Sequence, residues 1–252
     1  GITSSKGDFI QFLDSDDLIS HNKIELQVSA INNHKECIAL CHTKHFYNGE
    51  DYKTAVVNDY EAKFLFSTND PINFLLNLWG DNKEKKGSMV QTNAWLIPIS
   101  LINKAGLWSE HYSPDDDGEF FTRIICNSKQ IIFTDNCYNY YRKFRSNQSL
   151  SSLNSEKAIR GVYTSIQLKE QYLSKYLDQE TLQHVIGLQL ENIILVSYLN
   201  NKKIHKEILQ KYPHKRSFNY KLPLGGKAIN LINKLFGWQI ALKIQKIKHS
   251  II

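Results

Sequence analysis

The stretch GDFIQFLDSDDLIS, residues 7–20, decides the fold class of this chain. Its apolar run ends at Asp14, and Asp16 and Asp17 follow at once. Neighbouring carboxylates repel one another, so a cluster of them beside a buried strand is costly unless a partner neutralises the charge. Open α/β sheets bind their ligands at the carboxyl ends of strands. The stretch therefore predicts an α/β fold with a ligand site where its first strand ends.

Two interpretations of these carboxylates remain open from the stretch alone. Closely spaced carboxylate oxygens suit a hard divalent cation such as Mg²⁺ or Mn²⁺, which would allow Asp14 and Asp16 to hold a diphosphate. The structural alternative is that Asp16 or Asp17 only caps the helix that follows.

The pattern downstream predicts alternating short strands and helices up to about residue 150. A helix is expected from Ser20, as its N-cap, to about Asn32, and another from Asp70 with Pro71 at its first position. A short helix over 98–105 should end at Gly106. Strands are expected over 8–13, 37–47, 92–97, 129–135 and 137–144.

A second acidic cluster lies in SPDDDGEFFTRII, residues 113–125. The residues predict a helix that begins at or just after the carboxylates. One carboxylate held at a helix N-terminus would serve as a general base towards a hydroxyl group. The alternative, favoured by this segment alone, is helix capping together with a Glu119–Arg123 pair at i, i+4.

A basic loop follows the last expected strand, in YNYYRKFRSNQSLS, residues 138–151. Cationic side chains such as Lys143 and Arg145 on a loop of Ser and Asn would close over phosphate oxygens as a lid. A solvated basic loop without that role is the alternative.

Length and composition indicate a globular protein: the chain has 252 residues, of which 42% are hydrophobic and 22% charged. No basic and apolar leader is visible after Gly1. Four cysteines form no dense disulfide framework, so a reducing, cytoplasmic setting is expected. A partial zinc site at Cys37, Cys41 and His42 is disfavoured, because CIALCH alternates like a strand and no second ligand pair follows.

From about residue 154, the sequence shows long helical patterns in place of alternating short strands and helices. We therefore expect a boundary in NQSLSSL, residues 147–153, between a catalytic part over 1–150 and a helical extension over 151–252. The apolar run 185–199 contains polar residues and is too short to span a bilayer, so a buried helix of a helical hairpin is expected.

The carboxyl-terminal part of the chain is strongly basic. Residues 201–252 hold twelve Lys or Arg and one acid, Glu207, so this segment has a net charge of +11. Since the whole chain has a net charge of +6, residues 1–200 have a net charge of −5. Two amphipathic helices broken at Gly237, with Trp238 at the break, predict peripheral contact with an anionic membrane through 222–252. Packing on the catalytic part is the alternative. No nucleic-acid-binding motif is visible, so nucleic acid is not expected as a partner.

Taken in order, these segments resemble the family 2 glycosyltransferases, inverting enzymes with a GT-A (Rossmann-like) fold that are common in bacterial polysaccharide synthesis. SSKGDFIQFLDSDD is similar to the family's strand and D-x-D motif, and WLIPISLINKAGLW to its strand, short helix and Gly-aromatic turn. DDGEFFTR and YYRKFRSNQSLS match its acidic segment and its closing Tyr-Arg strand and loop. The resemblance covers about residues 1–150.

The resemblance implies roles for the first acidic cluster. Asp14 and Asp16 match the D-x-D motif, which contacts the ribose and the metal-bound diphosphate of a nucleotide-diphosphate sugar. Asp17 is the family's common third acid. Mg²⁺ or Mn²⁺ is the implied cofactor, and a saccharide or lipid-linked saccharide is the implied acceptor.

The resemblance also implies roles for the second acidic cluster and for Arg142. Asp117 aligns with the catalytic base that deprotonates the acceptor, and Asp116 stands where Glu is usual. Arg142 aligns with the Tyr-Arg strand as a phosphate contact. The family often has a bulkier residue where this chain has Gly118, which leaves Asp116 as the alternative base.

The family begins with βα units that carry the nucleotide-base pocket, and this sequence starts after them. The chain is therefore expected to be incomplete at its N-terminus, and whether it is active alone stays open. Two other functions remain: a haloacid-dehalogenase-like phosphatase, in which the first Asp is a nucleophile, and a non-catalytic acceptor- or membrane-docking fragment.

Overall fold

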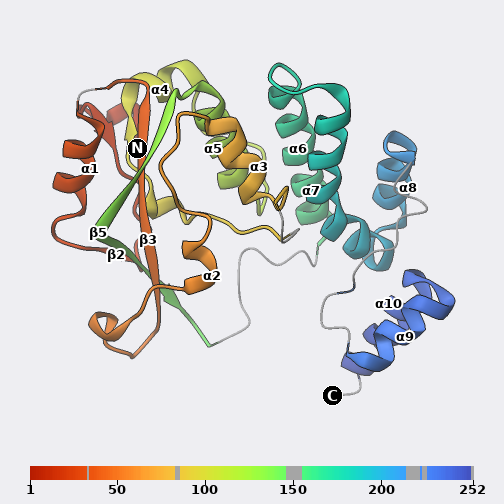
Figure 1. The fold of residues 1–252 in the computed structure, drawn as a ribbon. Helices are drawn as coiled ribbons and strands as arrows, with labels where there is room; N and C mark the ends of the chain where they lie inside the picture. Colours follow the sequence, from red (N-terminus) through yellow and green to blue (C-terminus); the bar gives the residue numbers. More distant parts are fainter. Residues whose placement is uncertain (33, 83–85, 146–154, 214–221, 223–225, 251–252) are drawn as a thin grey trace.

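The computed structural model describes residues 1–252 except 33, 83–85, 146–154, 214–221, 223–225 and 251–252. Strands and short helices alternate up to residue 143, and the described elements from residue 156 onwards are helices (Figure 1). The elements are η1 Ile2–Ser4, β1 Phe9–Ile10, β2 Leu18–Ile19, α1 Lys23–Ile31, β3 Cys37–Tyr47, η2 Tyr52–Thr54, α2 Asp59–Ala62, α3 Pro71–Leu78, η3 Thr92–Ala94, β4 Ile97–Pro98, α4 Ile99–Ala105, α5 Asp116–Asn127, β5 Gln130–Lys143, α6 Glu156–Leu173, α7 Gln179–Asn200, α8 Lys202–Lys211, α9 Lys227–Phe236 and α10 Trp238–Ser250.

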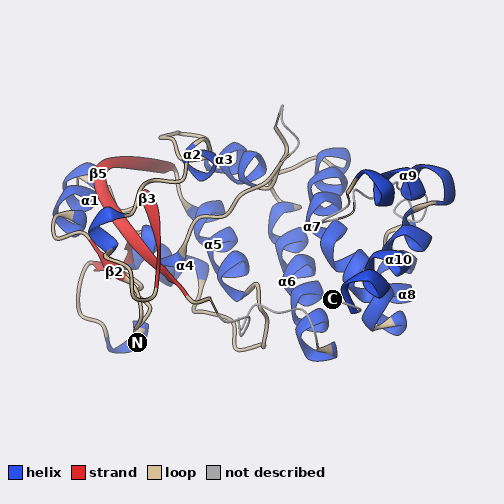
Figure 2. Cartoon of the chain, turned by 90° about the horizontal axis from the view of Figure 1, so that it is seen from below, coloured by secondary structure: helices blue, strands red, loops and turns tan. Residues whose placement is uncertain are grey.

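The sheet is built on β5, the long central strand. It pairs in parallel with β3 and antiparallel with β2, in the order β2-β5-β3. A separate antiparallel pair joins β1 to β4, and backbone hydrogen bonds between Ala39 and Leu96 connect it to β3. Helix α1 lies on one side of this sheet, and α3, α4 and α5 lie on the other (Figures 1 and 2). The mixed α/β class predicted from the sequence is confirmed.

Several elements form where the sequence predicts them. Strand β3 spans the predicted 37–47 and buries its first five residues. In α3, the Asp70 carboxylate accepts the Asn73 N–H at 3.0 Å and Pro71 occupies the first turn, as expected for a capped helix start. Helix α4 ends at Gly106, whose φ of +90° favours glycine.

Other boundaries differ from the prediction. The strand expected over 8–13 is reduced to β1, and the expected strand over 92–97 begins as the 3₁₀ turn η3. The two strands expected over 129–135 and 137–144 form the single strand β5, in which Asn136 takes a positive φ of 60°. Its register with β3 shifts close by, between Leu40 and His42.

Helix α1 differs in its start and in its buried face. It begins after Asn22, and Ser20 donates through its hydroxyl to Asn22 instead of capping the helix. The sequence pattern predicts an apolar face that includes Ile24, but Ile24 is exposed while Lys23 and Gln27 are buried. Lys23 Nζ donates to Gln27 Oε1 at 2.7 Å, and this bond satisfies a polar group that the helix buries.

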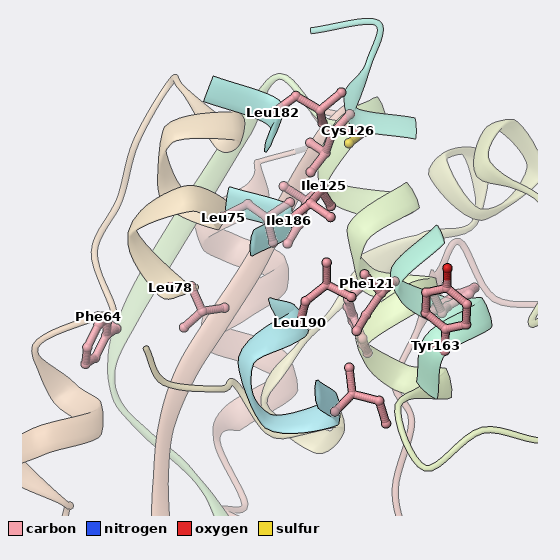
Figure 3. Close-up of a cluster of buried hydrophobic side chains, with 14 of the residues drawn as sticks. Phe64, Leu75, Leu78, Phe121, Ile125, Cys126, Tyr163, Leu182, Ile186 and Leu190 are labelled. Carbon is pink, nitrogen blue, oxygen red and sulfur yellow. The ribbon is translucent and has the colours of Figure 1, made fainter. Parts of the chain in front are cut away.

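One hydrophobic core connects the sheet region with the helices of the second half. Figure 3 shows part of it, where side chains of α3, α5, α6 and α7 meet; the labelled members include Leu75, Phe121, Tyr163, Ile186 and Leu190. Helix α7 contains the run 185–199, is buried along one side and packs on α6, so the predicted helical hairpin is confirmed. The predicted boundary at 147–153 lies outside the described residues.

The carboxyl-terminal helices α9 and α10 are separated at Gly237, as predicted. Trp238 at the break is buried, with its ring 5.1 Å from that of Tyr198, so it packs on α7. Among the described residues, none of the helices has the length and apolar character needed to cross a bilayer.

Candidate active site

The acidic stretch Asp14–Asp17 forms a tight turn between β1 and β2. The Asp17 N–H donates to the Asp14 carbonyl at 3.2 Å, which closes the turn. Asp14 and Asp16 are exposed, whereas Asp17 is 5% exposed. None of the three acids caps α1, whose N-cap is Asn22. The capping alternative for this cluster is therefore excluded.

Asn93 of η3, which the sequence did not single out, holds this turn from inside. Its Oδ1 accepts the Asp14 N–H at 3.2 Å, and its Nδ2 donates to Asp17 Oδ2 at 2.6 Å. Its carbonyl accepts from Gln11 Nε2 at 2.9 Å, and Gln11 Oε1 in turn accepts from buried Lys23 at 2.5 Å. Asn93 itself is 1% exposed. A polar chain from α1 thus supports the backbone of the acidic turn.

Arg142 of β5 lies against the same turn. Its backbone N–H donates to Asp17 Oδ1 at 2.7 Å, and its Nε donates to the Asp16 carbonyl at 2.6 Å. Its Nη1 donates to Asn48 Oδ1 at 3.2 Å, and the guanidinium lies 4.7 Å from the centre of the Phe46 ring. The structure therefore brings the predicted Arg142 together with the predicted acids. The direct contacts it makes here are with protein.

The charges of the turn influence one another. Burial, with the negative charges of Asp16 and Asp14 as smaller causes, raises the pKa of the Asp17 carboxyl to about 6. Hydrogen bonds from the Arg142 N–H and the Asn93 amide act in the opposite direction. The raised pKa of Asp17 therefore results mainly from its burial, and like charges in the same turn add to the effect.

The turn offers two carboxylates to a metal ion. Asp14 and Asp16 make no side-chain hydrogen bond or ion pair with any described residue, so their oxygens are available. The described part of the chain holds no group of three or more His, Cys, Asp or Glu arranged to bind a metal. This donor set fits Mg²⁺ or Mn²⁺ only where water and diphosphate oxygens supply the remaining ligands.

The second acidic cluster occupies the first turn of α5. Asp116 Oδ1 accepts the Asp117 N–H at 3.0 Å, and its Oδ2 accepts from Trp108 Nε1 at 3.2 Å. Asp117 Oδ1 accepts the Gly118 N–H at 2.7 Å. Burial, assisted by the charges of Asp115 and Asp116, raises the pKa of Asp117 above its ordinary value. A carboxyl group with a raised pKa is suited to accept a proton near neutral pH.

The expected Glu119–Arg123 pair is also present, and its role is structural. Arg123 Nε lies 2.7 Å from Glu119 Oε1, and both side chains are buried. The guanidinium also donates to the carbonyls of Ala105, Gly106 and Leu107, which ties α5 to the end of α4. Glu119 is thus committed to Arg123 and is not available as a base.

Aromatic side chains connect the two acidic clusters. Phe12, two residues before Asp14, has its ring 5.1 Å from that of Trp108, which bonds to Asp116. Tyr141 of β5 responds to the charges of both clusters: burial raises the pKa of its phenol, and the charges of Asp17, Asp16, Asp14 and Asp117 raise it further. The fold therefore brings together segments that are about a hundred residues apart in sequence.

Two further hypotheses from the sequence concern a zinc site and a lid over the phosphates. Cys37 donates to Gln130, whereas buried Cys41 contacts the Ala94 carbonyl, and the two belong to separate buried clusters, which does not support a zinc site. All four cysteines are free. The predicted lid falls largely on residues 146–154, outside the described residues. Arg145, at its start, pairs with Glu50 at 3.2 Å.

Residues 1–81 match the model of a known family, described as glycosyl transferase family 2. Over these residues, the resemblance to the family 2 glycosyltransferases expected from the sequence is confirmed. The match includes the acidic turn and ends before α5. No curated protein sequence is significantly similar to the chain.

Solved structures similar to the chain include three of S. aureus TarS. The crystal structure of TarS 1-349 is 16% identical over 80% of this chain and 50% of that one, with a TM-score of 0.49. TarS 1-349 in complex with UDP-GlcNAc is 16% identical over 89% and 72%, with a TM-score of 0.46. The complex with UDP is 15% identical over 93% and 56%, with a TM-score of 0.47. The chain spans half the length of the first of these structures.

Proposed function

We propose that the protein transfers a sugar from a nucleotide-diphosphate donor to an acceptor hydroxyl with inversion at the anomeric carbon, in the synthesis of a cell-surface polysaccharide. The observation that carries this proposal is the convergence of two acidic clusters. A turn matched by the family 2 model presents exposed carboxylates, and Phe12 and Trp108 connect it to the half-buried carboxylates at the start of α5. The acceptor would be a saccharide or a lipid-linked saccharide.

On the donor side, Asp14 and Asp16 would hold Mg²⁺ or Mn²⁺ together with the diphosphate. The bound cation would neutralise negative charge on the leaving diphosphate. Asp17, bonded to Asn93 and to the Arg142 N–H, keeps the turn in place. Arg142 lies at the same turn, and its guanidinium would add positive charge beside the phosphates.

On the acceptor side, Asp117 would act as the general base. It would take the proton from the acceptor hydroxyl as that oxygen bonds to the anomeric carbon, while the bond to the diphosphate oxygen breaks and its electron pair leaves with the nucleoside diphosphate. One displacement of this kind inverts the anomeric centre and needs no covalent enzyme intermediate. Asp116 is the alternative base, although its carboxylate is held by Trp108.

Release of nucleoside diphosphate from a panel of nucleotide-diphosphate sugars, including UDP-GlcNAc, tests this function in the full-length protein. We expect Mn²⁺-dependent release that an acceptor saccharide accelerates and that Asp16→Ala abolishes. Hydrolysis of a phosphomonoester, with no release from any sugar nucleotide, would instead identify a phosphatase. The absence of both activities and of donor binding would leave a docking role.

A peripheral membrane position is a further part of this proposal. Exposed apolar side chains gather on α9 and α10: Leu231, Leu235, Phe236, Ile240, Ile244 and Ile247. Lysines such as Lys227 and Lys234 lie on the same helices, and the two helices contain no acid. Apolar side chains flanked by lysines suit an anionic lipid surface, where the enzyme would meet a lipid-linked acceptor from the cytoplasmic side.

Flotation with vesicles of anionic phospholipid tests this contact. The triple variant Leu235→Ser, Phe236→Ser and Ile247→Ser should lose vesicle binding without unfolding, because all three side chains are exposed. The matched control changes exposed apolar residues elsewhere, Val56 and Met89, to Ser and should bind as the wild type does. Equal binding by the triple variant and the wild type would contradict the membrane contact.

A further inference from the structure

Helix α6, in the helical extension, contacts the acidic start of α5 through one stripe of side chains. Gly161, Ser165 and Lys169 are spaced four residues apart, so they lie on one face of α6, and all three are buried. A Cβ atom built on Gly161 would lie 2.2 Å from the Tyr112 carbonyl oxygen. The helix therefore packs directly on the backbone that leads into α5.

Lys169 makes the strongest of these contacts. Its ammonium lies 2.7 Å from Asp115 Oδ2, and its side chain is only 2% exposed. Burying an ammonium is costly unless a carboxylate pairs with it. Asp115 occupies the N-cap position of α5, where an Asp side chain usually accepts a backbone N–H, but here it makes no cap hydrogen bond. The carboxylate is instead committed to α6.

The ion pair lies over Gly118, the residue after Asp117. A Cβ at position 118 would lie 2.1 Å from Asp115 Oδ1 and 2.8 Å from Lys169 Nζ. Any larger residue at this position would therefore have to displace the Asp115 carboxylate or the Lys169 ammonium. This contact accounts for the glycine that departs from the usual family pattern, and it places the pair beside the backbone that carries Asp117.

A second polar chain runs parallel to the ion pair. Ser165 Oγ lies 2.9 Å from Ser113 Oγ, which in turn accepts the Asp115 N–H at 3.0 Å. His111 Nε2 lies 3.1 Å from the same Ser165 hydroxyl. Lys169 and Ser165, one turn apart on α6, thus hold Asp115 and Ser113, which lie directly before α5.

From these contacts we propose that Lys169, together with Asp115, is a positioning residue that fixes the first turn of α5 and so the placement of Asp117. The role of Asp117 as the base rests on the proposed function, whereas the fixing of the turn does not. Helix α6 would then complete the acceptor side of the site, although it lies beyond the segment that the family model matches.

The positive charge of Lys169 also affects the pKa of Asp117. Four titratable groups act on or face Asp117: Asp115 and Asp116 of its own segment, Lys169 of α6 and Tyr141 of β5. Among them Lys169 is the cation, and it lowers the pKa of Asp117 against the larger effect of burial. Removing its charge should therefore raise that pKa.

Hydrogen exchange in the full chain tests the positioning without any activity. In Lys169→Met, the amides of residues 113–121 should exchange about tenfold faster, as expected for the loss of one charge-assisted hydrogen bond. Lys169→Arg should stay closer to the wild type, and Lys175→Met, at an exposed lysine just beyond the end of α6, should not change the rate. An unchanged rate in Lys169→Met overturns the proposal.

A second variant covers the case in which Lys169→Met does not fold. Asp115→Asn combined with Lys169→Met leaves no unpaired charge, so it should fold and still show the faster exchange. In a transfer assay, the acidic limb of the kcat profile should move to higher pH in Lys169→Met and not in Lys175→Met. An unmoved limb overturns the effect on Asp117. If exchange responds but the wild type transfers no sugar, only the proposed function fails.

Discussion

The Asp17 carboxylate accepts a 2.7 Å hydrogen bond from the backbone N–H of Arg142, across 125 residues of sequence. The same carboxylate accepts from the Asn93 amide. Three separate segments therefore meet at one buried carboxylate, while Asp14 and Asp16 beside it remain exposed. Asp17 therefore organises the turn, and the proposed contacts with donor and metal are assigned to its two exposed neighbours.

The support of Asp17 by Asn93 can be tested by truncation. Asn93→Ala removes a buried hydrogen bond to the carboxylate, and it should lower the free energy of unfolding by about 1–3 kcal/mol in urea denaturation. Asn48→Ala, which removes only an exposed contact to Arg142, serves as the control and should cost much less. Equal effects of the two substitutions would argue against Asn93 as the support of the turn.

Asp117→Asn should separate function from stability. The raised pKa of Asp117 means that the folded protein disfavours its charged form, so the neutral amide should leave thermal stability at pH 7 unchanged or higher. Loss of the base should reduce kcat by about 10²–10⁴-fold. Asp116→Asn is the matched variant. A larger loss of kcat in Asp116→Asn than in Asp117→Asn would identify Asp116 as the base.

The pH dependence of transfer should reflect the same carboxyl group. Because the pKa of Asp117 is raised, the fraction of ionised base falls at a higher pH than for an ordinary aspartate. The kcat profile should therefore lose activity towards acid with a midpoint above 3.8, the ordinary value for Asp. A profile that stays flat down to this value would show that Asp117 does not limit the reaction.

Metal binding should depend on the nucleotide. The described residues offer the two exposed carboxylates of the turn and no third ligand, so Mn²⁺ alone should bind weakly. In calorimetric titrations, a nucleoside diphosphate such as UDP should tighten Mn²⁺ binding. Asp14→Asn and Asp16→Asn should remove this coupling. Tight Mn²⁺ binding without nucleotide, unaffected by either substitution, would point to another metal site.

The space above Gly118 allows a steric test. Gly118→Ala should destabilise the protein and slow transfer, because its Cβ would displace the Asp115–Lys169 pair. Gly226→Ala, whose Cβ would meet nothing within 4 Å, is the control and should be close to neutral. Thermal unfolding of both variants gives the comparison. Equal melting temperatures for the two would contradict the close packing over residue 118.

Local sequence signals predicted those elements that rest on local chemistry. Strand β3, the capped start of α3 and the glycine that ends α4 follow from alternation, capping and backbone freedom at their own residues. The sequence also predicts the acidic turn, because carboxylates clustered at the end of an apolar run repel one another and indicate a site that binds a partner. The family match over residues 1–81 confirms the resemblance for the segment that contains the acidic turn.

Features that depend on distant partners could not be predicted. The buried face of α1 includes Lys23 and Gln27, because Gln11 and Ala94 satisfy their polar groups from other segments. Asn93 carries no local signal, and it lies in a segment predicted as a strand. Lys169 appears as one lysine in a helix until the fold sets it against Asp115.

The anomeric configuration of the product is the most direct test of the proposed inverting transfer. The full-length protein, Mn²⁺, a donor that it uses and an acceptor are followed by proton NMR, with Asp117→Asn in parallel. We expect a product of opposite anomeric configuration to the donor, which the wild type forms and Asp117→Asn forms at least about a hundredfold more slowly. A product with retained configuration, or wild-type rates in Asp117→Asn, would contradict it.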